Sequence, residues 1–468
     1  MHDDTQVARV FEMGKMLGSG VFPVRWVPDL GYGYGYPIFN FYAPLAYYVG
    51  GLLMLIGFDA LIATKIMMIL GILLSGIFMY FLAREFWGEL GGAVSGLFYV
   101  YAPFHAVDIY VRGDVAEFWA YSFIPLVFLG FYKVFQNLKS EKLEVDNSKL
   151  QFKIQQFGIV GALGFAALIL SHNLTALMVT PFLLVFVLIL CIVSHKAKKI
   201  FTIYYLLFTI FLGLALSAFY WIPALLEMKY TNILSQIGGG ADFRDHFVCL
   251  SQLWSSTWGF GGSAKGCMDG LSFMIGKLHI LMTGLVLVLF LFGRLKQHKG
   301  IILFYLISFI LSLFLVLEMS KFLWEAIPIM AFFQYPWRFL TLVSFFSSLL
   351  AGSLVVLSSS LKIKPYWLAF PLIALLLFFN IKFFVPQTTF FATSKDFTNE
   401  KALKWTASKT SDEFLPPNFK KPKSEHEVSK MPLPFTETNI EKTSNLVSFI
   451  GALALIIGII FRYGKNKR

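Results

Sequence analysis

Apolar runs long enough to cross a membrane recur along this chain from residue 60 to its C-terminal end. About 20 apolar helical residues span the roughly 30 Å hydrocarbon core of a bilayer. Because 57% of the 468 residues are hydrophobic and only 14% are charged, the composition agrees with such spans. We expect an all-α integral membrane protein of about eleven transmembrane helices. The predicted spans are 60–82, 91–105, 118–135, 157–171, 174–194, 201–222, 277–293, 300–318, 338–358, 366–386 and 446–462.

Lysine and arginine cluster in the loops that fall on one side if these spans alternate. By the positive-inside rule this side is predicted to be cytoplasmic, together with the tail RYGKNKR. The net charge of +12 therefore reflects loop placement, and no nucleic-acid partner is expected. The basic loops contain Arg84, Lys139, Lys142, Lys149, Lys153, Lys196, Lys198, Lys199, Arg294, Lys296, Lys299, Lys362 and Lys364.

The opposite, external side receives the long polar segments. Segment 41–57 is short and contains Pro44 and several tyrosines, so we interpret it as an interfacial helix rather than a further span. The predicted parts are an external loop with interfacial helices (1–59), an N-terminal transmembrane bundle (60–222), an external loop (223–276), a C-terminal transmembrane bundle (277–386), an external extension (387–445), and a last helix with a cytoplasmic tail (446–468).

The external head of the chain raises the question of its export. Met1 is followed by polar residues, with neither the basic nor the apolar region of a signal peptide. We expect an upstream signal-anchor helix that this sequence lacks. Asp3 and Asp4 would then lie just outside the membrane. As carboxylates they are candidate general bases, and the alternative is that they are solvated loop acids.

The segment HAVDIYVRGDVAEF (105–118) places Asp108, Arg112, Asp114 and Glu117 in a predicted external loop. If a helix opens at Asp114, then Asp114 and Glu117 share one face, and capping would explain both acids. Arg112 lies on the predicted external side, contrary to the positive-inside rule. Its planar guanidinium suits a phosphate or carboxylate, and the alternative is a simple ion pair to Asp108 or Asp114.

Other polar residues lie at predicted external span ends. Arg338 in QYPWRF is a candidate phosphate contact, with membrane anchoring beside Trp337 as the alternative. His172 and Asn173 occupy a tight turn between two spans. If functional, they would orient a donor phosphate or an acceptor hydroxyl. The alternative is that they only satisfy the hydrogen bonds of the turn. Glu227 is a candidate site acid, but we interpret it as a solvated interface residue.

The three cysteines divide between compartments. Cys249 and Cys267 fall in the external loop and can form a disulfide, although two external cysteines are weak evidence for a bridge. Cys191 falls inside a span. The eight histidines are scattered without metal-ligand spacing, so no metal site is expected from them.

Several stretches carry a resemblance to known membrane proteins. GYGYPIFNFYAPLAYY, VDIYVRGDVAEFWA, LSHNLTAL, SAFYWIPALLE and FFQYPWRF resemble the bacterial membrane family labelled 6-pyruvoyl-tetrahydropterin synthase-related, over at least residues 1–350. That label does not give the function, because the soluble synthase needs a zinc-binding histidine cluster. An external acidic pair and a helix ending in "AR" also resemble the C-type polyprenyl-phosphate-sugar glycosyltransferases, called GT-C.

The resemblance implies an outward-facing enzyme of the bacterial inner (plasma) membrane. It would transfer a sugar from a polyprenyl-phosphate donor to an envelope lipid, glycan or protein, with membrane lipids as further partners. Asp3 or Asp4 would be the base, with a divalent metal as an option at this pair. Arg112 and Arg338 would hold phosphate, and Asp114, Glu117, His172 and Asn173 would orient the substrates. The alternatives are a lipid or polysaccharide transporter and a noncatalytic envelope assembly factor.

Overall fold

The protein is helical throughout the part of the chain that a computed structural model describes, which comprises residues 2–140, 148–193, 199–236, 241–295, 297–386 and 388–465. Helices account for 73% of the chain, and the described residues contain no strand beyond two isolated bridges. Six basic residues used above for orientation lie outside these ranges: Lys142, Lys196, Lys198, Lys296, Lys467 and Arg468.

Seven described helices are long and apolar enough to cross a membrane, or up to eight if the bent pair Thr202–Leu216 and Ala218–Tyr230 is one span. The protein is thus a multi-pass helical membrane protein. The predicted number of eleven spans is not confirmed. Two predicted spans fall within one helix, and two others coincide with short apolar helices. The seven are Ala60–Val100, Val115–Leu138, Asn173–Val193, Lys299–Val316, Pro336–Leu361, Tyr366–Phe384 and Asn439–Ile460.

Helix α4 (Ala60–Val100) folds back on itself at Gly88, whose φ of 74° lies in the left-handed region. A Cβ at Gly92 would lie 2.9 Å from the carbonyl oxygen of Tyr80, and one at Gly96 would lie 3.0 Å from that of Gly76. These contacts join residues on opposite sides of Gly88. The predicted spans 60–82 and 91–105 are therefore the two arms of a helical hairpin whose close approach requires glycine.

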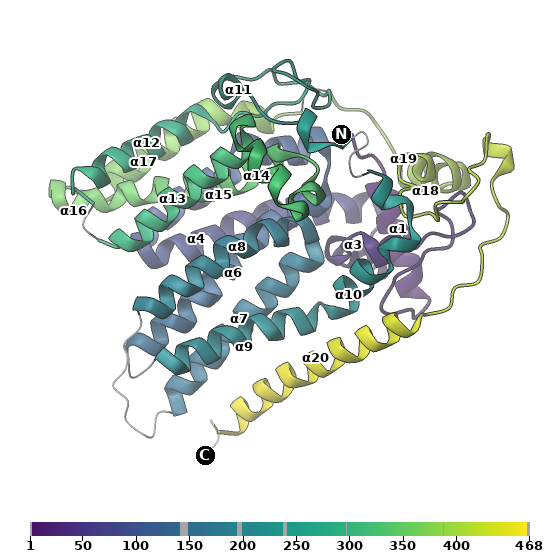
Figure 1. The fold of residues 1–468 in the computed structure, drawn as a ribbon, viewed down its shortest axis with the longest axis horizontal. Coiled ribbons are helices and arrows are strands. Elements are labelled where there is room, and N and C mark those ends of the chain that lie inside the picture. Colours follow the sequence, from purple (N-terminus) through teal and green to yellow (C-terminus); the bar gives the residue numbers. More distant parts are fainter. Residues whose placement is uncertain are drawn as a thin grey trace. The chain divides into compact units, whose positions relative to one another are not determined.

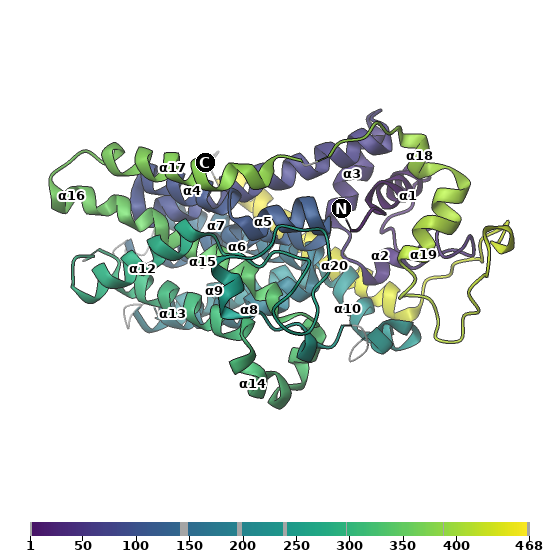
Figure 2. The ribbon, with the colours of Figure 1, turned by 90° about the horizontal axis from the view of Figure 1, so that it is seen from above.

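The chain divides into two compact units. The first contains Met1–Asp4, Met68–Pro125 and Ser235–Ala392. Its α15 is buried along its whole length and packs on both arms of α4. The Leu349 carbonyl accepts from the Trp87 indole N–H of the first arm (2.9 Å) and from the Ser95 hydroxyl of the second arm (3.3 Å). Helices α12, α13, α15 and α17 run side by side, with α16 at one end (Figures 1 and 2). The helices here are α4, α5 (Pro103–Ala106), η1 (Val107–Arg112), the start of α6 (Val115–Ser140), α11 (Leu250–Trp254), α12 (Lys277–Leu291), α13 (Lys299–Val316), α14 (Lys321–Ala326), η8 (Pro336–Phe339), α15 (Leu340–Ser353), η9 (Leu354–Val356), α16 (Leu357–Leu361) and α17 (Tyr366–Asn380).

The second unit contains Thr5–Met67, Leu126–Leu234 and Thr393–Arg468. Small residues let its helices approach closely: Gly50 meets Val10 between α1 and α3, and Gly213 meets Phe165 between α9 and α7. Helix α20 packs on α9 and α10 (Figure 1). The helices here are α1 (Gln6–Gly18), α2 (Ile38–Phe41), α3 (Leu45–Leu55), the rest of α6, α7 (Ser148–Ser171), α8 (Asn173–Val193), α9 (Lys199–Leu216), α10 (Ala218–Glu227), α18 (Ser394–Thr398), α19 (Ser408–Thr410) and α20 (Asn439–Lys465).

The predicted external extension packs within this second unit onto the loop GYGYGY. The amide of Ser429 donates to the Tyr32 carbonyl (2.9 Å), and the Tyr32 hydroxyl donates to Asp412 (3.0 Å). Phe414 is buried and stacks on Phe41 with ring centroids 5.4 Å apart. Residues 393–445 thus contribute apolar side chains to a core, in contrast to a purely solvated arm.

Candidate functional site

Arg112 is the centre of a buried ionic cluster in the first unit. It ends the π-helical segment η1, and Gly113 follows with a φ of 67°, which lets the chain turn directly into α6. Asp114 then caps α6, because its carboxylate accepts from the Glu117 amide (3.1 Å). The capping expected for Asp114 is therefore present, and it positions both acids beside Arg112.

Three carboxylates surround the Arg112 guanidinium. Nη1 pairs with Asp108 and with Glu117 (2.8 Å), and Nη2 pairs with Asp114 (2.7 Å). Arg112, Asp108 and Glu117 are buried, with 8%, 0% and 0% of their surfaces exposed. The ion pair considered as the simpler alternative thus exists, extended to a third acid. The remaining N–H groups of Arg112 are few, so a phosphate here would compete with carboxylates.

The charge balance of this cluster depends on Asp108. Burial and the neighbouring Glu117 raise the pKa of Asp108 well above its usual range, against the lowering effect of Arg112. Although burial lowers it, the three carboxylates together raise the pKa of Arg112 well above its usual range. Arg112 is therefore charged, and the raised pKa of Asp108 means that this acid binds a proton more readily than an exposed aspartate does.

Arg338 lies in η8, directly before α15, and also contacts this cluster. Its Nε lies 3.5 Å from Glu117 Oε2, and its Nη1 donates to the Phe333 carbonyl (3.0 Å) and the Gln334 side chain (3.1 Å). Thr341, one turn further along, donates to Glu117 Oε1 (3.0 Å). Glu117 thereby ties the loop after η1 to the span that contains Arg338.

An aromatic wall covers the cluster. The Arg112 guanidinium lies 4.6 Å from the Trp337 ring centroid, a cation–π geometry, and Tyr335 stacks on Trp337 at 4.9 Å. The Trp337 indole N–H donates to Ser263 (3.1 Å), whose hydroxyl also bonds His246 (2.8 Å). Residues 241–276 therefore form a covering loop against this wall.

A disulfide between Cys249 and Cys267 closes this loop, with Cα atoms 5.6 Å apart. Of the two outcomes that the sequence left open, the structure contains the bridge. Cys191 is a buried thiol in α8 and is not part of the disulfide. The bridge holds the ends of the segment that carries Ser263 and so helps position the side chains that contact Trp337.

The N-terminal acid pair reaches the same cluster through its backbone. The His2 amide donates to the Val111 carbonyl (2.8 Å), and the Asp3 amide donates to the Arg112 carbonyl (3.0 Å). The His2 ring also bonds the Phe260 carbonyl of the covering loop. Asp3 is half-buried and Asp4 is exposed. Two segments separated by more than a hundred residues, each singled out from the sequence, therefore lie together in the first unit.

His172 and Asn173 belong to the second unit, and their contacts in it are local. His172 Nδ1 bonds the Thr175 hydroxyl (2.7 Å), and Asn173 Oδ1 accepts from the amide of Leu174 (2.9 Å). These contacts open helix α8 and satisfy the turn, as the structural alternative expected.

The interpretation of Glu227 as a solvated residue is wrong. It is 6% exposed and accepts from Asn40 Nδ2 (2.8 Å) and Thr438 Oγ1 (2.5 Å) within the second unit. Asn40 in turn accepts from the buried Arg25 (2.8 Å), which also bonds Asn445. The hydrogen-bond partners of this glutamate lie far from it in sequence, so no local pattern indicates its burial.

The described residues contain no group of three or more His, Cys, Asp or Glu side chains placed to hold a metal ion. Asp3 and Asp4 thus have no third protein ligand in the described part of the chain.

Three members of the cluster escaped the sequence-based choice of site residues. Asp108 lies four residues before Arg112, a spacing that pairs charges on a helix, and this signal was available. Trp337 adjoins Arg338 in the quoted motif, but its stacking on Arg112 needs the fold. Thr341 had no signal, because its partner Glu117 lies 224 residues away.

The chain is similar to one curated protein, described as uncharacterized, from Lactococcus lactis subsp. cremoris (strain MG1363). The two are 26% identical over 328 residues, which is 68% of this chain and 49% of the relative. The chain therefore spans about half the length of the relative that it matches. No family model matches the sequence. No solved structure matches it either.

Proposed function

We propose that the protein is a GT-C-type membrane glycosyltransferase that transfers a sugar from a polyprenyl-phosphate donor to an envelope lipid, glycan or protein. One observation carries this proposal: the Asp3 amide bonds the Arg112 carbonyl (3.0 Å), which sets an accessible acid pair beside a buried ionic cluster. Glycosyl transfer requires a carboxylate base close to groups that stabilise a leaving phosphate. Both kinds of group lie here in one unit.

In the proposed reaction the carboxylate of Asp3 or Asp4 takes the proton of an acceptor hydroxyl. The acceptor oxygen bonds to the anomeric carbon while the bond from that carbon to the phosphate oxygen breaks, and the electron pair leaves with the phosphate. Arg338 is the cation that stabilises this leaving group, because the described residues give it one carboxylate partner, Glu117 at 3.5 Å from its Nε, whereas Arg112 has three.

Arg112 has a positioning role in this proposal. Its three carboxylate partners occupy most of its donors, and it fixes the backbone carbonyl to which Asp3 bonds. Asp114 and Glu117 act through Arg112 and Arg338 respectively. In the sequence-based expectation both arginines hold phosphate, whereas here only Arg338 does. The two arginines should therefore have different kinetic effects when they are replaced.

The proposed location is the bacterial inner membrane, with the site facing outward and the C-terminus in the cytoplasm. The disulfide in the covering loop supports the outward direction, because disulfides persist in oxidising compartments. The basic residues that line the opposite predicted side, such as Arg294 and Lys364, support a cytoplasmic assignment for it.

A noncatalytic assembly factor is the second candidate, and the saturation of Arg112 favours it. A buried cluster in which each arginine already meets carboxylates can serve only to hold two spans and a loop together. In that case the acid pair at the N-terminus would have no chemical task, and its neutralisation would leave function intact.

The test is sugar transfer by the full-length protein in proteoliposomes supplied with radiolabelled polyprenyl-phosphate sugars and envelope acceptors. Asp3→Asn and Asp4→Asn are compared with Asp245→Asn, which removes a half-exposed loop acid of the same unit. Transfer that falls about 100-fold or more in one acid-pair variant and persists in the control supports the proposal and identifies the base. Equal transfer in all three contradicts the assigned base. No transfer by folded wild-type protein favours the assembly factor.

A further inference from the structure

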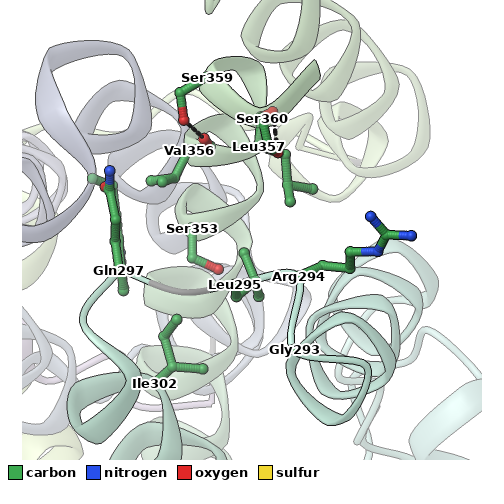
Figure 3. A pocket seen from close by; sticks show the side chains of 11 residues that line it. Gly293, Arg294, Leu295, Gln297, Ile302, Ser353, Val356, Leu357, Ser359 and Ser360 are labelled. Atoms are coloured by element: carbon green, nitrogen blue, oxygen red, sulfur yellow. Dashed lines mark hydrogen bonds between the residues drawn. The ribbon is translucent and has the colours of Figure 1, made fainter. Parts of the chain in front are cut away.

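A cavity of about 350 Å³ lies in the first unit at the far end of the span that begins near Arg338. Arg294 and Gln297 lie on opposite sides of it, Ser353 lies between them, and Ser359 and Ser360 lie along one rim (Figure 3). Trp87 contributes an aromatic side. About 22 helical residues from Arg338 to Ser360 span roughly 33 Å, so this cavity is separate from the Arg112 cluster.

Arg294 is the cation of this cavity, and its guanidinium has no ion-pair or hydrogen-bond partner among the described residues. Its backbone amide bonds the Leu289 carbonyl (2.9 Å). Arg294 also lines an adjoining open cavity of about 670 Å³, together with Leu289 and Phe292. A planar cation beside mostly apolar cavity walls matches a phosphate that carries an apolar tail.

The apolar side chains around the cavity fit acyl chains. Leu291, Phe292 and Leu361 are 72%, 78% and 58% exposed, at the ends of α12 and α16. These helices belong to the apolar bundle, so their exposed faces meet lipid. The cavity, with its arginine and serines among apolar side chains, therefore lies at the depth where headgroups meet the hydrocarbon core.

The charge at this end selects an anion. Lys299, Lys362 and Lys364 are exposed and lie on the same connecting segments as Arg294 or on those adjoining the rim serines. Helix α13 starts at Lys299 without a side-chain cap, and the dipole of an 18-residue helix adds partial positive charge there. An anionic lipid is thus favoured over a zwitterionic one.

The serines that line the cavity indicate a second property of the ligand, besides its negative charge. Ser353, Ser359 and Ser360 each donate their hydroxyl proton to a helix carbonyl, at 2.6, 2.9 and 2.9 Å. Their oxygens keep acceptor lone pairs, which suit a hydroxyl donor on the ligand. We propose that this cavity binds the headgroup of an anionic phospholipid with free hydroxyls, with its phosphate on Arg294 and its hydroxyls on the serines.

The experiment measures lipid binding to the full chain in detergent by native mass spectrometry. The probes are phosphatidylglycerol, phosphatidylcholine and soluble glycerol 3-phosphate. Arg294→Gln removes the phosphate contact, and Ser360→Phe fills the cavity from an exposed position. Lys364→Gln is the matched control, because it removes one charge from the same end without lining the cavity.

We expect phosphatidylglycerol to bind at least about tenfold more tightly than phosphatidylcholine, and Arg294→Gln to weaken it about tenfold, the value of a charge-assisted hydrogen bond. Ser360→Phe should lower binding similarly, and Lys364→Gln by about twofold or less. Equal binding of both lipids, or unchanged binding by Arg294→Gln in folded protein, overturns the proposal. Glycerol 3-phosphate binding as tightly as the lipid also overturns it, in favour of a soluble phosphate ester.

Discussion

Arg112 Nη1 lies 2.8 Å from Glu117 Oε2, and both side chains are buried. The same carboxylate oxygen lies 3.5 Å from Arg338 Nε. One oxygen of Glu117 thus couples the loop that receives the N-terminal acid pair to the span that carries Arg338. The consequences of removing either arginine differ, because Arg112 neutralises three acids whereas Arg338 pairs with one.

Arg112→Ala should lower the free energy of unfolding by about 3–5 kcal/mol, because it leaves the buried carboxylates of Asp108 and Glu117 without their cation. Thermal unfolding in detergent measures the change. Arg244→Ala is the control, since Arg244 is about half exposed and its surface ion pairs contribute little. Equal midpoints for the two variants would show that the cluster does not stabilise the fold.

Arg338→Ala should act mainly on the donor. We expect the donor KM to rise or kcat to fall by about tenfold or more, because a charge-assisted contact to the leaving phosphate is lost. Arg338→Lys keeps the charge and should recover part of the activity. Steady-state kinetics in proteoliposomes measures this change in KM or kcat. A thermal unfolding midpoint for each variant separates it from a folding defect. A loss of stability with unchanged kinetics in the remaining folded fraction would contradict the phosphate role.

Glu12 should make stability fall as pH rises. Burial, followed by the nearby Asp29, raises the pKa of Glu12 from 4.5 to about 8. Between these two values the folded state binds more protons than the unfolded state, so this contribution is fully present below pH 4.5 and is lost as pH rises through 8. Glu12→Gln should remove this slope and stabilise the protein at pH 8 by on the order of 4 kcal/mol.

Unfolding midpoints of wild type and Glu12→Gln from pH 5 to pH 9 check this prediction. Asp396→Asn is a suitable comparison. The backbone amide of Thr393 lowers the pKa of this exposed carboxyl, which gives the opposite sign of pH dependence. Parallel curves for wild type and Glu12→Gln would show that the buried glutamate is not protonated in the fold.

The disulfide should leave a single reactive thiol. Alkylation of the denatured, unreduced protein should modify only Cys191, and alkylation after reduction should modify all three cysteines. Intact mass gives the number of adducts. Cys249→Ser should also destabilise the covering loop, because a bridge over 18 residues contributes about 3 kcal/mol. Three adducts before reduction would contradict the bridge.

Gly352→Ala should disrupt the contact of α15 with α4. Its Cβ would lie 2.2 Å from Ser95 Oγ and 2.3 Å from the Gly91 carbonyl, so the helices must separate at a cost of about 1–3 kcal/mol. Gly284→Ala in α12 is the matched control, since nothing lies within 4 Å of its Cβ. We expect that control to be neutral or slightly stabilising in thermal unfolding. A neutral Gly352→Ala would mean that α4 and α15 are not in contact there.

Part of the site could be recognised in the sequence because its members are local. Asp108, Arg112, Asp114 and Glu117 fall within ten residues, and helical spacing brings opposite charges together without help from the rest of the chain. The capping by Asp114 was foreseen for the same reason. The contact of Asp3 with Arg112 and that of Thr341 with Glu117 required the fold, because no local pattern encodes a pairing across a long stretch of chain.

The sequence by itself determined that this is a helical membrane protein, because long apolar runs must satisfy their backbone groups internally in lipid. Only the tertiary structure decided which of these helices are separate spans. The predicted spans 60–82 and 91–105 became one hairpin at Gly88, and Glu227 became a buried acid. Apolar length is a property of each segment alone, whereas close packing and the burial of a charge depend on partners elsewhere in the chain.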